Sequence, residues 1–154
     1  MKPYTVHVDI DLPRDRVLEL FDDADNLIKW QTDFVSFEPL SGDPGQVGAK
    51  AKLTYQMGKK TVELIETVTV RELPERFDGT YEWGGGWNEL ENRFIVLAPD
   101  KTRWESTCTY HMKSPMLRVM GFLMPGMFKK QNQKFLDQFK AFCETGADVR
   151  DQAR

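Results

Sequence analysis

The sequence predicts an α+β domain in which a curved, seven-stranded antiparallel sheet surrounds a long C-terminal helix. Apolar and polar residues alternate over most of the region from 35 to 112, and an amphipathic stretch with helical spacing follows it. Two short helical stretches also separate the first strand from the second. We place a single domain at residues 1–146 of the 154 and expect a frayed tail over 147–154.

The chain begins with a half-buried strand, whose inward residues are Tyr4, Val6, Val8 and Ile10. Pro13 suits the first turn of the helix that follows, because a missing N–H has no consequence there. The apolar face of that helix carries Val17, Leu18 and Phe21. A second short helix, capped by Asp25 or Asn26, carries Leu27, Ile28 and Trp30.

Six further strands follow, joined by short turns, in the pattern of an antiparallel meander. Val35 and Phe37 mark the first of these six. Each of the other five has one set of residues on a shared face, which we take as the inner one: Ala51, Leu53, Tyr55 and Met57; Val62, Leu64, Glu66, Val68 and Val70; Phe77, Tyr81 and Trp83; Asn88, Leu90, Asn92, Phe94 and Val96; and Trp104, Ser106, Cys108, Tyr110 and Met112.

The closing region is expected to be helical, with an interruption at Gly121, Pro125 and Gly126. Ser114 and Pro115 suit the start of a helix, and the main helix is expected from about Met127 to Thr145. Its inward face carries Phe128, Asn132, Phe135, Leu136, Phe139, Phe142 and Cys143.

Four short motifs occur along the chain in this order: Val8-x-Ile10-x-Leu12-Pro13, Asn26-Leu27-x-x-Trp30, Gly45-x-Val47-Gly48-Ala49 and Phe128-Lys129-Lys130-Gln131. With the order of strands and helices, they resemble the START-like, or helix-grip, superfamily, and in particular its bacterial polyketide cyclase-like branch. That superfamily also includes Bet v 1-type allergens and START lipid-transfer domains. The resemblance implies a helix-grip fold with an interior cavity for an apolar small molecule, and the fold alone does not decide function.

Our leading hypothesis is that an apolar or amphipathic molecule, lipid-like or polyketide-like, binds between the sheet and the C-terminal helix. The residues expected to line this cavity are Leu53, Tyr55, Val68, Tyr81, Trp83, Phe94, Tyr110, Asn132, Phe135 and Phe139. The tyrosine hydroxyls would orient a polar group of the ligand, or would instead bond to protein or water as core aromatics do.

Glu66 is the one candidate catalytic residue, because alternation places its carboxyl group between Leu64 and Val68 on the inner face. Burial there would raise its pKa and suit it to acid–base chemistry of cyclase or hydratase type. A bulge that turns the side chain outward, or a position at the open rim, is the structural alternative. Whether the chain is an enzyme is therefore left open, as is a third role as a regulatory, partner-docking domain.

Several other classes of function are disfavoured. A net charge of −3 without a basic stripe argues against a nucleic-acid partner. His7 and His111 lie on outward positions without metal-ligand spacing, so we expect no metal and no cofactor. Gly84-Gly85-Gly86 lacks the rest of a phosphate loop and reads as a flexible hairpin. Two distant cysteines, with no visible signal sequence or membrane span, predict a cytoplasmic location.

Methionines are concentrated in segment 116–128, together with leucine and phenylalanine. We interpret this segment as packing over the open end of the sheet, with a gating role, in preference to membrane contact. The oligomeric state is left open.

Overall fold

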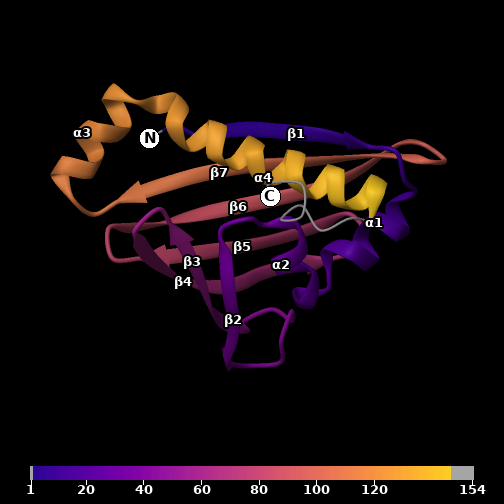
Figure 1. Cartoon of the computed structure of the whole chain (residues 1–154), viewed down its shortest axis with the longest axis horizontal. Helices are drawn as coiled ribbons and strands as arrows, with labels where there is room; N and C mark the ends of the chain where they lie inside the picture. The colour runs from indigo at the N-terminus through magenta and orange to yellow at the C-terminus, as the bar shows by residue number, and fades with distance from the viewer. Residues whose placement is uncertain (1, 147–154) are drawn as a thin grey trace.

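A computed structural model describes residues 2–146, and the predicted tail over 147–154 lies outside them. The elements follow in the order β1 (Tyr4–Ile10), α1 (Arg14–Phe21), the 3₁₀ turn η1 (Ala24–Asn26), α2 (Leu27–Trp30), β2 (Phe34–Ser41), β3 (Lys50–Met57), β4 (Lys60–Glu72), β5 (Arg76–Trp83), β6 (Gly86–Ala98), β7 (Lys101–Met112), α3 (Pro115–Leu123) and α4 (Pro125–Thr145) (Figure 1). None of these helices is long and apolar enough to cross a bilayer.

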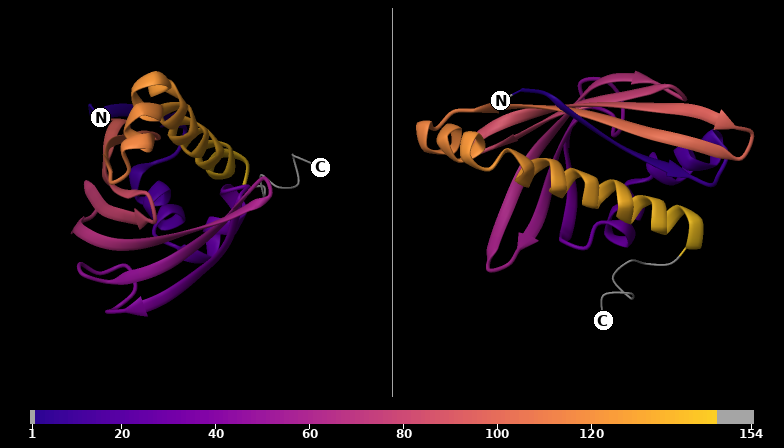
Figure 2. Two further views of the ribbon diagram at one scale, coloured as in Figure 1. Left: turned by 90° about the vertical axis from the view of Figure 1, so that its left-hand side faces the viewer. Right: turned by 90° about the horizontal axis from the view of Figure 1, so that it is seen from above.

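All seven strands form one antiparallel sheet in the order β1-β7-β6-β5-β4-β3-β2. The first strand pairs with the last, so the connection through α1 and α2 carries the chain from one edge of the sheet to the other. The sheet curves, and α4 lies across its concave side (Figure 2). The predicted α+β, helix-grip architecture is therefore confirmed.

The helix ends differ in detail from the expected ones. Asn26 lies at the N-cap position of α2, as expected, but its side chain makes no capping hydrogen bond. Asp23 accepts one from the backbone N–H of Asp25 at the start of η1. The long helix α4 begins at Pro125, directly after the separate helix α3. It ends as expected at Gly146, whose φ of 70° is left-handed and whose N–H donates to the carbonyl of Phe142.

A bulge in β2 changes the expected pattern of inward residues. The register with β3 shifts between Phe34 and Ser36, so Phe34 faces the core and Val35 is exposed. Val35 and Phe37, the two residues that mark this strand in the sequence, therefore differ in exposure, because one extra residue in a strand reverses the side on which its neighbours lie.

Aromatic side chains fill the core beneath the C-terminal half of α4. Phe139 is fully buried, and its ring centroid lies 5.2 Å from that of Trp104 and 5.1 Å from that of Trp30. Phe21 from α1 packs edge-on against Phe94 at 5.0 Å. These contacts tie α1, α2, β6, β7 and α4 into one hydrophobic cluster.

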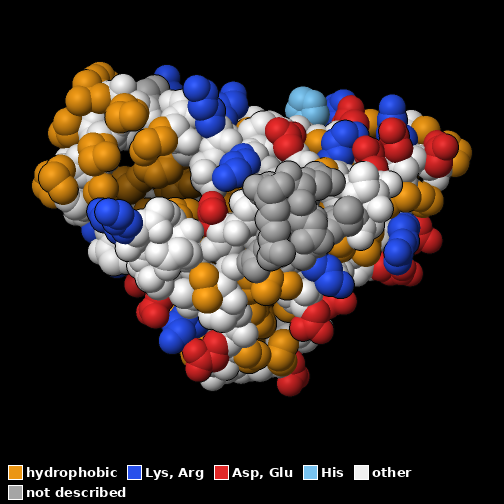
Figure 3. Space-filling view, in the orientation of Figure 1, with side chains coloured by type: hydrophobic (Ala, Val, Ile, Leu, Met, Phe, Trp, Pro, Cys, Tyr) orange, Lys and Arg blue, Asp and Glu red, His pale blue; other side chains and the backbone are white. Residues whose placement is uncertain are grey.

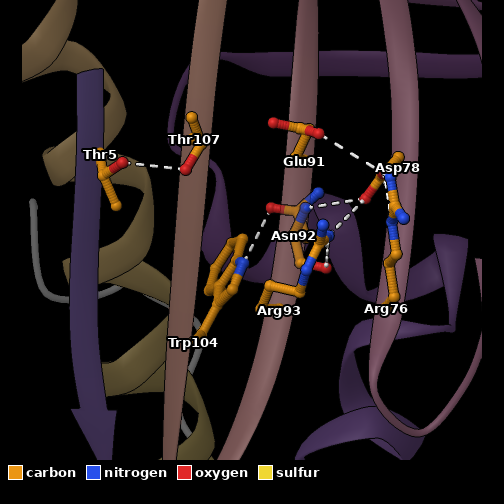
Figure 4. Close-up of polar contacts among 8 residues, drawn as sticks. All are labelled: Thr5, Arg76, Asp78, Glu91, Asn92, Arg93, Trp104 and Thr107. Carbon is orange, nitrogen blue, oxygen red and sulfur yellow. Dashed lines mark hydrogen bonds and ion pairs between the residues drawn. The ribbon is translucent and has the colours of Figure 1, made fainter. Parts of the chain in front are cut away.

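A polar network braces the sheet next to this core (Figure 4). Asp78 on β5 is only 4% exposed, and its carboxylate accepts hydrogen bonds from Arg76 at 2.7 Å and Arg93 at 3.2 Å. It also accepts from the backbone N–H of Asn92, whose side-chain oxygen accepts from the indole N–H of Trp104. The buried carboxylate is therefore satisfied, as a buried charge must be.

Candidate functional site

Four polar side chains form a row across the concave face of the sheet. The strand register places Glu66 opposite Tyr81, Tyr81 opposite Asn88, and Asn88 opposite Tyr110. Directly opposed residues of antiparallel strands point to the same side, so this row spans β4, β5, β6 and β7. The structure therefore places Glu66 on the inner face, as its position in the alternation predicted.

Glu66 and Tyr81 are joined by a hydrogen bond. The hydroxyl of Tyr81 donates to Oε2 of Glu66 at 2.8 Å, and Oε1 of Glu66 accepts no hydrogen bond from residues 2–146. Burial raises the pKa of Glu66, and the hydrogen bond from Tyr81 offsets part of that rise. Burial together with the nearby carboxylate of Glu66 raises the pKa of Tyr81 well above its ordinary value. The pair can donate or accept a proton through Glu66, while Tyr81 remains a hydrogen-bond donor.

A shallow pocket that is open to solvent lies beside this carboxyl group, and its enclosed space has room for about one water molecule. Its apolar walls come from β2, β3, β4 and the β2–β3 loop, and comprise Phe37, Pro39, Pro44, Ala49, Ala51 and Val68. Glu66 also lines it and supplies the acidic group. Lys50 lines it as well, so an acidic and a basic side chain accompany the apolar walls.

The other end of the row meets a group of aromatic rings under the start of α4. Tyr110 lies 4.6 Å from Phe128, 5.9 Å from Trp83 and 6.2 Å from Tyr4, measured between ring centroids. Asn132 on α4 donates to the hydroxyl of Tyr4 at 2.6 Å. The molecular surface is hollowed in this region, and hydrophobic side chains of the α3 end rim the hollow (Figure 3).

The remaining predicted lining residues belong to two packed clusters. Leu53 and Tyr55 are buried with Phe34, and Phe135 from α4 packs against them. The hydroxyl of Tyr55 donates to the side chain of Gln31 at 2.7 Å, so it already has a protein partner. Phe94 and Phe139 belong to the aromatic cluster beneath the far half of α4. Their contact with a ligand stays a prediction.

Several residues of the site were not among the expected lining residues, including Gln31, Phe37 and Tyr4. Gln31 follows a four-residue helix and has no periodic pattern to reveal it. Phe37 was recognised as a strand residue but was not linked to Glu66, because their proximity depends on the strand register. Tyr4 had an identifiable signal, since it shares its face with Val6 and Val8.

Outside this row, the described residues offer neither a metal-binding cluster nor an activated thiol. Residues 2–146 contain no group of three or more acidic, histidine or cysteine side chains arranged to hold a metal ion. Both cysteines are buried and unpaired. Burial raises the pKa of the Cys108 thiol and raises the pKa of Cys143 to about 12, so neither is an activated nucleophile.

A comparison with known protein families gives a match over nearly the whole chain. Residues 1–144 match the family described as polyketide cyclase / dehydrase and lipid transport. The chain belongs to this family. A comparison with curated proteins found no match.

Solved structures of the same superfamily share the fold at low sequence identity. The ZhuI aromatase/cyclase from Streptomyces sp. R1128 has a TM-score of 0.76 at 11% identity, covering 92% of this chain and 93% of that one. The allergen structure Ara h 8.0201 has a TM-score of 0.72 at 13% identity, with coverages of 92% and 97%. Norcoclaurine synthase from Thalictrum flavum, in complex with dopamine and hydroxybenzaldehyde, has a TM-score of 0.70 at 15% identity, with coverages of 92% and 85%. These similarities establish the Bet v 1-like fold of this family member.

Proposed function

We propose that this chain binds an apolar or amphipathic small molecule on the concave face of the sheet, beneath the N-terminal half of α4. The observation that carries the proposal is the polar row from Glu66 to Tyr110 on the concave face. The shallow pocket lies at its Glu66 end, and the surface is hollowed toward α3. Family membership supports a hydrophobic ligand. Oε1 of Glu66 would accept a hydrogen bond from a hydroxyl or N–H group of the ligand.

Extraction of the bound molecule tests the proposal. Native mass spectrometry of freshly purified protein, followed by organic extraction, would compare the wild type with Ala51→Leu. Ala51 lines the pocket opposite Glu66, so a larger side chain fills the space that a ligand needs. Val47→Ser, at an exposed position outside the pocket walls, is the control. We expect a mainly apolar molecule from the wild type and the control, and little from Ala51→Leu. Equal recovery from all three proteins would refute the proposed location.

A second function, catalysis of cyclase or hydratase type, is favoured by the raised pKa of Glu66 beside a hydroxyl donor. Glu66 would transfer a proton to or from the ligand, and Tyr81, whose hydroxyl donates to Glu66, would hold that carboxyl group in position. Two of the structural neighbours, an aromatase/cyclase and norcoclaurine synthase, are named as enzymes. Incubating the extracted molecule with protein distinguishes the two functions: conversion by wild type and not by Glu66→Gln supports catalysis, whereas unchanged molecule supports a carrier.

We also propose that residues 1–146 form a single domain and that the protein is cytoplasmic. The single sheet and the contacts of α4 with its concave face support the first proposal. Two buried, unpaired thiols suit a reducing compartment.

A further inference from the structure

The helix α3 exposes most of its apolar side chains. Phe122 is 84% exposed, Leu123 71% and Met116 69%. The exposed apolar surface continues through Val119, Met120, Met124 and Met127. The packing of this segment over the sheet, expected from the sequence, is therefore absent for these side chains.

Only a narrow side of α3 contacts the rest of the molecule. Gly121 is buried, and Leu117 is half-buried against the β5–β6 hairpin. A Cβ atom at Gly85 would lie 2.4 Å from Leu117 Cδ1, so the helix approaches that hairpin closely at this point. The remaining apolar face has no partner among the described residues. Exposed apolar surface of this extent on a short helix marks an interaction surface.

The charged residues of this part of the sequence have one sign, although Lys113 and Lys134 pair with Glu82 and Asp33 from other elements. No Asp or Glu occurs between Glu105 and Asp137, and this stretch contains five basic residues: Lys113, Arg118, Lys129, Lys130 and Lys134. Lys129 and Lys130 are exposed and make no ion pair with residues 2–146. The chain as a whole carries −3, so this end is a local basic region on an acidic protein.

We propose that α3 and the first turns of α4 form a docking surface for an anionic lipid membrane. The apolar side chains of Phe122 and Leu123 would insert between lipid chains, while Lys129 and Lys130 would lie near anionic headgroups. Short amphipathic helices with apolar and basic residues bind the bilayer interface in this way. Figure 3 shows the hydrophobic side chains gathered over the α3 end of the molecule, with Lys and Arg side chains beside them.

A second copy of the chain fits this surface less well. A two-fold dimer through α3 would place the basic side chains of both copies around one interface, without acidic side chains from this segment to pair with them. An anionic bilayer instead complements both the apolar and the basic components. The docking surface is independent of the proposed ligand, although the hollow in Figure 3 lies next to it.

Vesicle co-sedimentation tests this proposal, with phosphatidylcholine vesicles that contain or lack phosphatidylglycerol. We expect the wild type to bind vesicles that contain phosphatidylglycerol, and added salt to weaken the binding. Lys129→Gln with Lys130→Gln should weaken it about thirty-fold, which corresponds to about 2 kcal/mol for two basic residues. Phe122→Ser with Leu123→Ser should weaken it at least about ten-fold.

Matched double variants elsewhere on the surface provide the controls. Lys59→Gln with Lys60→Gln removes the same charge from an exposed hairpin, and Val47→Ser with Val96→Ser removes exposed apolar side chains. Both controls should bind vesicles like the wild type. The proposal is overturned if the wild type does not sediment with anionic vesicles. It is also overturned if the control variants lose binding as strongly as the Lys129/Lys130 and Phe122/Leu123 variants. The surface would be assigned to a second copy instead if the protein does not bind vesicles and light scattering shows a dimer that the Phe122 and Leu123 substitutions dissociate.

Discussion

Tyr81 and Glu66 lie directly opposite each other on neighbouring strands, and the tyrosine hydroxyl donates to the carboxylate at 2.8 Å. The ring of Tyr81 also lies over Gly79 of the same strand, with its hydroxyl oxygen 3.8 Å from the position a Cβ would take. A half-buried carboxyl group is thus held next to a hydrogen-bond donor and beside a shallow pocket. Four predictions follow from this site and from the core that supports it.

Replacing Glu66 with Gln should change how stability depends on pH. Burial raises the pKa of Glu66 above 4.5, so the folded protein keeps a proton that the unfolded chain has already lost. The stability linked to this group is therefore fully present below pH 4.5 and is lost as the pH rises through the raised pKa. Because Gln cannot ionise, the variant should gain stability relative to wild type as the pH rises.

Urea unfolding from about pH 4 to about pH 8 measures this difference. Glu63→Gln, which changes an exposed carboxyl group of the same strand, is the control and should show no such trend. A difference between Glu66→Gln and wild type that does not vary with pH would show that Glu66 is solvated in the folded state.

Tyr81→Phe should raise the pKa of Glu66 further. The hydrogen bond from Tyr81 lowers that pKa, and phenylalanine cannot donate. At neutral pH we expect the loss of this bond to reduce the free energy of unfolding by about 1–3 kcal/mol. Carboxyl NMR titration of the wild type and the variant measures both pKa values. An unchanged Glu66 titration would mean that the hydrogen bond is not formed in solution.

Two phenylalanines should respond very differently to truncation. Phe139→Ala removes a fully buried ring from the aromatic cluster and should cost roughly 3–5 kcal/mol of stability. Phe122→Ala removes a ring that is 84% exposed and should change stability by less than about 0.5 kcal/mol. Chemical denaturation of both variants tests this contrast. A small loss of stability for Phe139→Ala would indicate empty space next to Phe139. Such space is what the expected contact between Phe139 and a ligand requires.

Asp78→Ala should be strongly destabilising although it lies outside the proposed ligand site. It leaves the backbone N–H of Asn92 and two arginines without their shared acceptor (Figure 4). We expect a loss of about 2–3 kcal/mol. Glu91→Ala, which removes an exposed carboxylate 3.8 Å from Arg76, is the control and should have little effect. Equal losses in the two variants would mean that the network contributes no more than a surface ion pair.

The sequence predicted the fold well because alternation and helical spacing persist through nearly every element. The inward position of Glu66 followed from the same alternation. The pairing of Glu66 with Tyr81 did not follow from it. A cross-strand pair depends on the register between two strands, which the pattern of a single strand does not contain. The exposure of Val35 could not be predicted for a related reason, because a bulge is a property of two paired strands. The apolar residues of α3 show a further limit: a pattern reveals an apolar face but not whether the fold covers it.

The most direct test of the ligand site is backbone NMR of the labelled protein during titration with 2-naphthol, an apolar ring system with one hydroxyl group. We predict the largest amide shift changes at Glu66, Tyr81, Asn88 and Tyr110, and their loss in Ala51→Leu. Changes confined to the exposed helix α3, or no changes at these four residues up to the solubility limit of 2-naphthol, would contradict the proposed site.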